Sequence, residues 1–342
     1  MAKIITFGEI MLRLSPPGNQ RFMQATSFDV TYGGSEANIA MAMTGYGHQV
    51  TYVSKLPHHA IGDCAIAKLR QSNVNCDFIL RGDGRLGIYF LENGASVRAS
   101  SIVYDRENSL ISLAKPEEFD WEEIFKDADW FHTSGITPVL SENAANITLE
   151  ALKYAKKMGL GTSFDLNYRE KLWQTEAEKK QQKISEMMKY VDVCFGNARD
   201  AAMVLGYKNP ETDYLHGEFV TCLEEKSLQL VRNEYDFSVI VSPYRESISA
   251  SDNGYTAVAL DKKGYYRGKK FMVHIVDRVG TGDAFVGGFL HGILEKKGTQ
   301  KALDYGIASA AIKHTIPGDV NYASVDEMEK LIKGDVAGRV IR

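Results

Sequence analysis

The sequence lacks the features that mark several classes of protein. Its 342 residues include four cysteines, Cys64, Cys76, Cys194 and Cys222, without a C-x-x-C spacing or paired histidines. A zinc site and a disulfide framework are therefore disfavoured, and reduced thiols are the simplest interpretation. No stretch reaches the ~18 apolar residues of a membrane span, and no long apolar segment of a secretory signal follows the N-terminal residues. We expect a cytoplasmic protein.

The sequence also has no strong excess of charge of either sign. It carries 40 basic and 44 acidic residues spread along the chain, which gives a formal net charge of -4. A nucleic-acid-binding protein or a protein of anionic membrane surfaces would show clustered positive charge. We therefore expect a small-molecule ligand.

Two common nucleotide-binding signatures are missing as well. No G-x-x-x-x-G-K-[ST] sequence is present, which excludes a Walker-type site. Residues 82–87 satisfy G-x-G-x-x-G, but they precede an expected strand, whereas the dinucleotide fingerprint follows a strand and opens a helix. A nicotinamide-dependent dehydrogenase is therefore only a remote alternative.

Short apolar runs alternate with longer amphipathic segments along most of the chain. Expected strands lie at residues 4–7, 50–53, 130–133, 162–165, 191–195 and 237–241, with expected helices at 37–46, 141–158 and 176–190. This alternation is typical of an α/β fold in which a doubly wound, mostly parallel sheet carries helices on both faces. Ligands of such folds bind beyond the carboxyl ends of the strands.

Two segments of the sequence do not follow this alternation of strands and helices. Residues 82–112 show near alternation of polar and apolar positions with a turn at Glu92-Asn93-Gly94, and we group residues 13–32 with them as a second inserted segment. We expect these two segments to form a small antiparallel sheet, and residues 1–12, 33–81 and 113–342 to form the core. A sheet of this size is marginal alone, so it closes over a ligand as a lid, pairs with a second copy as a dimer clasp, or does both. A homo-oligomer joined through this sheet is expected.

A glycine pair opens an expected helix in the first third of the chain. In Gly33-Gly34-Ser35-Glu36-Ala37-Asn38, the glycines allow a ligand to approach the backbone closely, and Asn38 lies one helical turn after Gly34. The Asn38 amide can therefore bind a hydroxyl group. The alternative is an ordinary helix start with Ser35 as its N-cap.

A second glycine-rich turn lies near the end of the chain. An expected strand at 271–276 is followed by Gly280-Thr281-Gly282-Asp283 and an expected helix at 284–294. The N–H groups of such a turn, with the helix dipole, form an anion hole, and phosphoryl transfer needs this hole together with a base for the acceptor hydroxyl. Asp283 is the candidate base. The alternative is that Asp283 only caps the helix.

Together the two glycine motifs resemble the two signatures of the ribokinase-like (PfkB) carbohydrate kinases. The resemblance extends over essentially the whole chain and implies ATP and Mg²⁺, with a requirement for a monovalent cation left open. It implies that Asp283 is the catalytic base, that Gly280, Thr281 and Gly282 form the anion hole, and that Gly280 and Gly282 contact ATP. It further places Asn197 at the phosphates, Asp200 at a water-bound Mg²⁺ where the family has Glu, and Lys313 beside the nucleotide. A catalytically silent sugar sensor would share this fold, but the intact Asp283 argues against it.

Several side chains suggest that the acceptor sugar is an acid. Tyr104-Asp105-Arg106 and the segment from Asn167 to Trp173, which contains Arg169, resemble the substrate-binding segments of 2-keto-3-deoxygluconate kinases within this family. We expect Arg106 and Arg169 to bind the carboxylate, because arginine suits bidentate recognition of this group. Gly34, Asn38, Tyr89 and Tyr104 would then line the rest of the sugar site. A fructokinase or another neutral-sugar kinase is the nearest alternative.

The segment after the expected strand at 237–241 departs from the family pattern. Family members often have a glycine-rich turn near the nucleotide at this point, whereas this chain has Ser242-Pro243-Tyr244-Arg245-Glu246-Ser247. The residues that contact adenine therefore stay unassigned.

Overall fold

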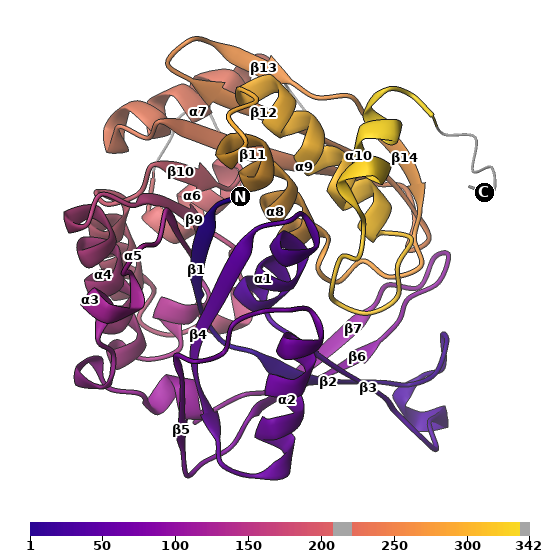
Figure 1. The fold of residues 1–342 in the computed structure, drawn as a ribbon. Coiled ribbons are helices and arrows are strands. Elements are labelled where there is room, and N and C mark those ends of the chain that lie inside the picture. Colours follow the sequence, from indigo (N-terminus) through magenta and orange to yellow (C-terminus); the bar gives the residue numbers. More distant parts are fainter. Residues whose placement is uncertain (208–220, 336–342) are drawn as a thin grey trace.

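A computed structural model describes residues 1–207 and 221–335 of the chain (Figure 1). Its main sheet has ten strands in the order β13-β12-β11-β10-β9-β8-β1-β4-β5, with β14 paired to β12. The strands from β5 to β11 in this order are parallel, whereas β12, β13 and β14 add antiparallel pairings at one end. The bounds are β1 (Lys3–Phe7), β4 (Gln49–Pro57), β5 (Ile79–Gly82), β8 (Trp130–Ser134), β9 (Gly161–Asp165), β10 (Val193–Phe195), β11 (Val239–Ser247), β12 (Asp252–Asp261), β13 (Tyr265–Arg267) and β14 (Phe271–His274).

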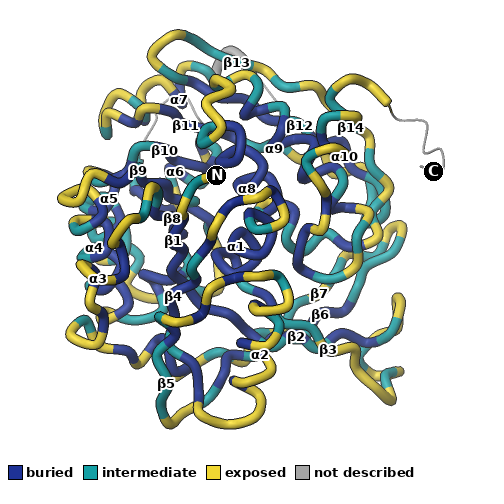
Figure 2. Tube along the Cα trace, viewed as in Figure 1, coloured by how far each residue is buried: buried dark blue, intermediate teal, exposed yellow. Residues whose placement is uncertain are grey.

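Helices cover both faces of this sheet. One face packs against α1 (Ser35–Gly45), α2 (Ala60–Gln71), α8 (Thr281–Leu294), α9 (Thr299–Lys313) and α10 (Val325–Ile332). The other packs against α3 (Trp121–Ile124), α4 (Glu142–Lys157), α5 (Ala177–Met188), α6 (Ala198–Leu205) and α7 (Thr221–Tyr235). Figure 2 shows the central strands buried between these layers.

The central strand β1 shows why the sheet needs both layers. Ile4 belongs to the core on one face, whereas Ile5 and Phe7 belong to the core on the other, because successive side chains point to opposite sides of a strand. A strand buried on both faces is a continuous apolar run. The short apolar runs of the sequence are such strands.

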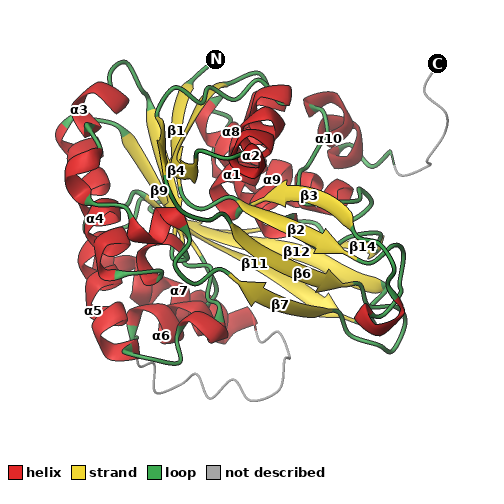
Figure 3. Ribbon diagram, turned by 90° about the horizontal axis from the view of Figure 1, so that it is seen from below, coloured by secondary structure: helices red, strands yellow, loops and turns green. Residues whose placement is uncertain are grey.

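The remaining strands form a separate four-stranded sheet beside the core (Figure 3). Its order is β3 (Asp29–Gly33), β2 (Met11–Ser15), β6 (Gly87–Glu92) and β7 (Ser101–Asp105). The two outer pairings are antiparallel, as the alternating sequence predicts, but the central pairing of β2 with β6 is parallel. Strand β2 begins at Met11, two residues before the expected inserted segment, and its pairing with β6 joins the two segments into one sheet.

The predicted fold class is confirmed, and two local features add to it. Residues 242–247, to which the sequence assigned no element, extend β11 to Ser247, and β11 pairs with β12 along its whole length. Helix α8 begins at Thr281, so Asp283 lies inside its first turn. Short 3₁₀ helices complete the described structure, at Phe22–Gln24, Leu110–Leu113, Pro116–Glu118, Thr137–Val139 and Glu170–Leu172. Within the described ranges, no helix is both long and apolar enough to span a membrane.

Candidate active site

A cavity of about 490 Å³ lies between the small sheet and the core. Its walls come from the carboxyl end of β9, the N-termini of α1 and α8, the middle of β11 and the inner face of the small sheet. The predicted site residues that line it are Gly34, Asn38, Tyr89, Tyr104, Arg106, Arg169, Asp200, Gly280, Thr281, Gly282 and Asp283. The cavity therefore lies where ligands of doubly wound α/β folds bind.

Asp283 does not act as the N-cap of α8. Gly280 occupies that position with a φ of 77°, a left-handed conformation that favours glycine. The Asp283 carboxylate instead bonds to α1: Oδ1 accepts a hydrogen bond of 2.8 Å from Ser35 Oγ, and Oδ2 accepts one of 2.7 Å from Asn38 Nδ2. The two glycine motifs of the sequence thus meet at this carboxylate.

The start of α8 provides positive charge beside Asp283. N–H groups in the first turn of a helix have no partner within the helix, and the helix dipole adds partial positive charge there. Gly280, Thr281 and Gly282 all line the cavity. An anionic group in the cavity would therefore find N–H donors next to the carboxylate.

Four acidic residues, Asp165, Asp200, Asp283 and Asp319, line the cavity, and burial raises the pKa of the first three. Burial raises the pKa of Asp283, although bonds from Asn38 and Ser35 and the charge of Arg169 oppose the shift. Burial and the nearby Asp283 charge raise the pKa of Asp165, the last residue of β9, to about 8. Burial also raises the pKa of Asp200. A carboxylate with a raised pKa is a stronger base, as proton abstraction requires.

The raised pKa of Asp165 predicts how stability changes with pH. Between the unfolded value near 3.9 and about 8 in the folded state, the folded protein binds more protons than the unfolded chain. Stability is therefore lost as pH rises through this window. Asp165→Asn removes the titration and should raise the melting temperature at pH 8 more than at pH 5. Calorimetry at both pH values, with the exposed Asp83→Asn as control, measures this difference. An equal change at both pH values would contradict it.

Three arginines around the cavity hydrogen-bond neutral oxygens. Arg169 Nη1 donates to Tyr168 O at 3.0 Å, Arg245 Nη2 to Thr281 Oγ1 at 3.2 Å, and Arg278 Nη2 to Ala250 O at 2.9 Å. Among the residues that the structure describes, none of the three forms an ion pair with a carboxylate. Burial lowers the pKa of Arg245, and the charges of Arg278 and Arg169 lower it further. Such a group of cations favours an anionic ligand.

Sequence reasoning did not assign a function to Asp165, Arg245 or Arg278. Asp165 ends a predicted strand, and Arg278 lies two residues before the glycine turn. Both positions could therefore have indicated a site residue. Arg245 had no such signal, because the sequence predicted no element for residues 242–247. Only the continuation of β11 carries it to the cavity.

Some predicted site residues already bind other side chains of the same chain. Arg106 forms a buried ion pair with Glu9, and its guanidinium lies 5.5 Å from the Tyr104 ring centre. The Tyr89 hydroxyl donates a hydrogen bond to Asp319. Arg106 therefore reaches the cavity with its charge already balanced by a carboxylate.

Two predicted nucleotide-binding residues do not line the cavity. Asn197 is the N-cap of α6, where Asp200 N donates to its side chain at 2.9 Å and Asn197 N donates to Asp200 Oδ2 at 3.1 Å. Lys313 is buried, and its Nζ donates to Ile316 O at 2.9 Å. Asn197 thus orients Asp200, and Lys313 holds the turn after α9.

The model for the pfkB family of carbohydrate kinases matches residues 1–324. The chain belongs to this family, which confirms the resemblance seen in its motifs. The comparisons give no support to the dehydrogenase alternative.

Individual relatives are similar over nearly the full chain. The crystal structure of 2-dehydro-3-deoxygluconokinase from Thermotoga maritima has 44% sequence identity and a TM-score of 0.92, covering 97% of this chain and 98% of that one. 2-Dehydro-3-deoxygalactonokinase of Haloferax volcanii is 35% identical over 98% of both chains. 2-Dehydro-3-deoxygluconokinase of Thermoproteus tenax is 27% identical over 97% of this chain and 95% of its own.

Proposed function

We propose that this carbohydrate kinase transfers the γ-phosphoryl group of ATP to the terminal hydroxyl of 2-keto-3-deoxygluconate, also called 2-dehydro-3-deoxygluconate. The products are 2-keto-3-deoxy-6-phosphogluconate and ADP. The observation that carries the proposal is the position of Asp283 at the start of α8, in the same cavity as three arginines that lack a carboxylate partner in the described structure. The relatives named for 2-dehydro-3-deoxy sugar acids support the acceptor.

In the proposed reaction, Asp283 accepts the proton of the terminal hydroxyl. The hydroxyl oxygen forms a bond to the γ-phosphorus while the bond to the oxygen bridging the β- and γ-phosphates breaks, and ADP leaves. Ser35 and Asn38 fix the Asp283 carboxylate by their hydrogen bonds, so the base is oriented before the sugar binds. The N–H groups of Gly280, Thr281 and Gly282 stabilise the charge on the transferred group.

The residues beside the glycine turn at 280–282 fit an Mg²⁺–ATP complex. Mg²⁺ keeps several waters and needs only one or two carboxylates beside the phosphates. Asp200 supplies one carboxylate, which Asn197 N orients. Arg245 and Arg278 stand near the glycine turn and supply positive charge for the phosphates. Bound Mg²⁺ would neutralise the charge that develops on the phosphates.

The sugar acid would lie between the glycine pair of α1 and the small sheet. Gly34 lines the cavity and packs against the Glu9 backbone, where a Cβ atom would come within 1.9 Å of the carbonyl oxygen. Arg169 is the proposed carboxylate ligand, and Arg106 lines the same cavity. Asn38, Tyr89 and Tyr104 provide polar groups or ring surface along the rest of the sugar site.

A coupled assay of ADP release tests the proposed function. The acceptors compared are 2-keto-3-deoxygluconate, 2-keto-3-deoxygalactonate, fructose and ribose, each with Mg²⁺–ATP. The proposal expects the highest kcat/KM for 2-keto-3-deoxygluconate. A higher value for fructose or ribose would establish a neutral-sugar kinase, and a higher value for the galactonate would reassign the stereochemistry.

Arg169→Ala is expected to raise the KM for the sugar acid by about 10- to 100-fold, because a hydrogen-bonded charge pair contributes about 1.5–3 kcal/mol. The KM for ATP should change far less, since the glycine turn remains intact. Steady-state kinetics with each substrate varied in turn separates the two constants. The exposed Arg267→Ala serves as a matched control. A sugar-acid KM like that of the wild type would refute the carboxylate assignment.

We also propose that two copies of the chain pair through the outer face of the small sheet. Cross-strand neighbours Leu14, Val30, Phe90 and Val103 form an apolar row on this face, and Val30 and Val103 are 57% and 49% exposed. Exposed apolar rows of this kind mark association surfaces. Sedimentation velocity of the full chain tests the expected dimer or higher oligomer.

A further inference from the structure

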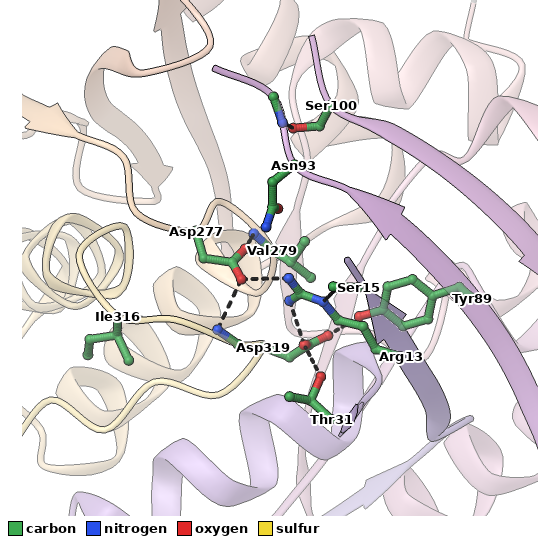
Figure 4. A network of polar contacts seen from close by, with 12 residues as sticks. Arg13, Ser15, Thr31, Tyr89, Asn93, Ser100, Asp277, Val279, Ile316 and Asp319 are labelled. Carbon is green, nitrogen blue, oxygen red and sulfur yellow. Dashed lines mark hydrogen bonds and ion pairs between the residues drawn. The ribbon is translucent and has the colours of Figure 1, made fainter. Parts of the chain in front are cut away.

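A buried network of charged side chains lies next to the proposed active site (Figure 4). Its centre is Arg13 on β2, which is only 3% exposed and points to the core from the inner face of the small sheet. Arg13 Nη2 donates to Asp277 Oδ2 at 2.7 Å, and Nη1 donates to Asp319 Oδ2 at 2.9 Å. Its Nε donates to Ser15 Oγ at 2.8 Å. One guanidinium thus bridges two carboxylates from separate loops.

Asp277 and Asp319 both contact backbone at or beside the glycine turn, Asp277 through its carboxylate and Asp319 through its carbonyl oxygen. Asp277 Oδ1 accepts a hydrogen bond from Val279 N, and Oδ2 accepts one from Gly318 N, each at 3.0 Å. The carbonyl oxygen of Asp319 packs so closely on Gly280 that a Cβ atom there would lie 1.8 Å away. The positions of Asp277 and Asp319 therefore fix where the turn before α8 begins.

In the described part of the chain, the side chains that hydrogen-bond Asp319 all come from the small sheet. Thr31 Oγ1 on β3 donates to Asp319 Oδ2 at 3.3 Å, and the Tyr89 hydroxyl on β6 donates to Oδ1. With Arg13, three strands of the small sheet reach one carboxylate of the core. The network thus joins the small sheet to the core. Among the described residues that form its hydrogen bonds, Arg13 is the only one with a positive charge.

The charges make this network sensitive to the loss of Arg13. Burial opposes a charged guanidinium, but Asp319 and Asp277 outweigh this effect and raise the pKa of Arg13. Removing one partner of a buried ion pair leaves an uncompensated charge and is strongly destabilising. Without Arg13, the two buried carboxylates would lose the guanidinium between them and repel each other, although the charge of the buried Lys313 also acts on both.

We infer that Arg13 is a positioning residue that couples docking of the small sheet to the geometry of the glycine turn. The inference rests on the proposed function for its catalytic consequence. Arg13 does not line the cavity that contains Asp283, so its effect passes through Asp277 and Asp319. The small sheet would thereby set the position of the anion hole as well as cover the sugar.

Two measurements test this inference, and the first does not depend on the reaction. Hydrogen exchange of the free protein should show faster exchange in residues 275–283 for Arg13→Ala than for the wild type. The matched control is Arg85→Ala, which removes an exposed ion pair to Asp105 on the same sheet and should leave these residues unchanged. Unchanged exchange at 275–283 in folded Arg13→Ala would overturn the inference, whatever the substrate proves to be.

The second measurement is kinetic. Arg13→Ala should lower kcat by about 10- to 100-fold at a temperature where it is folded, because small misplacements of catalytic groups have effects of this size. Millimolar guanidinium ion should restore part of this loss by occupying the space between the two carboxylates, whereas methylammonium should restore less. If Arg13→Ala does not fold, kcat is measured for Arg13→Lys instead. This variant keeps the positive charge but cannot donate to both carboxylates with the planar geometry of a guanidinium. A kcat within twofold of wild type in the folded variant would overturn the coupling.

Discussion

Asp283→Asn is expected to lower kcat by about 10²- to 10⁴-fold, the range that a general base contributes. The amide keeps the size of the carboxylate but cannot accept the proton of the acceptor hydroxyl. Ser35 Oγ and Asn38 Nδ2 each donate to a separate oxygen of Asp283, so the substitution also disturbs one of these bonds. Steady-state and single-turnover kinetics with Mg²⁺–ATP measure the loss.

The fold should survive this substitution, because the amide removes a buried charge whose pKa burial has raised. A matched control is Asp326→Asn, which changes an exposed acidic residue in the first turn of α10. Near-wild-type turnover of Asp283→Asn would show that Asp283 serves only to link α8 to α1. A lowered melting temperature with unchanged kcat would lead to the same conclusion.

Gly280→Ala is expected to lower kcat by about 100-fold, because a shift of about 1 Å in a catalytic group has an effect of this size. Gly280 has a φ of 77°, which costs other residues about 1–2 kcal/mol. Its new Cβ would also lie 1.8 Å from the carbonyl oxygen of Asp319, so the turn or that loop must move. Either movement displaces the N–H groups at the start of α8.

Gly298→Ala separates these two effects. Gly298 is the N-cap of α9 with a φ of 82°, and a Cβ atom there would meet nothing within 4 Å. The control therefore introduces backbone strain at a positive φ, with a ψ of 163° in place of 3°, but without the collision. Gly280→Ala should lower kcat much more than Gly298→Ala does. Similar kinetics for the two variants would show that the close packing on Asp319 has no catalytic importance.

Much of the fold could be predicted from local pattern. Strands buried on both faces are visible as apolar runs, and the helix α4 is visible from apolar residues three and four positions apart. The start of α8 was predicted three residues late, because a left-handed glycine N-cap such as Gly280 leaves no side-chain signal. The parallel pairing of β2 with β6 was missed because alternation fixes which face is buried but not the direction of the partner strand.

The site was less predictable than the fold. Motifs identified residues close to helix starts, such as Asn38 and Asp283, because the glycines beside them are rare enough to notice. Ion pairs between residues far apart in the sequence could not be predicted from local pattern. Arg13 and Asp319 are 306 residues apart, and Arg106 and Glu9 are 97 residues apart. Their pairing depends on how the small sheet docks, which no local pattern encodes.

The hydrogen bond between Ser35 and Asp283 has a consequence for the order in which the molecule is made. These residues are 248 positions apart, so α1 leaves the ribosome long before the carboxylate that it orients has been synthesised. Helix α8 also fills the core beside α1, and distant contacts of this kind form late because a long loop must close first. A nascent chain that ends before α8 would hold an unfinished core and no base, so activity would begin only once synthesis is nearly complete.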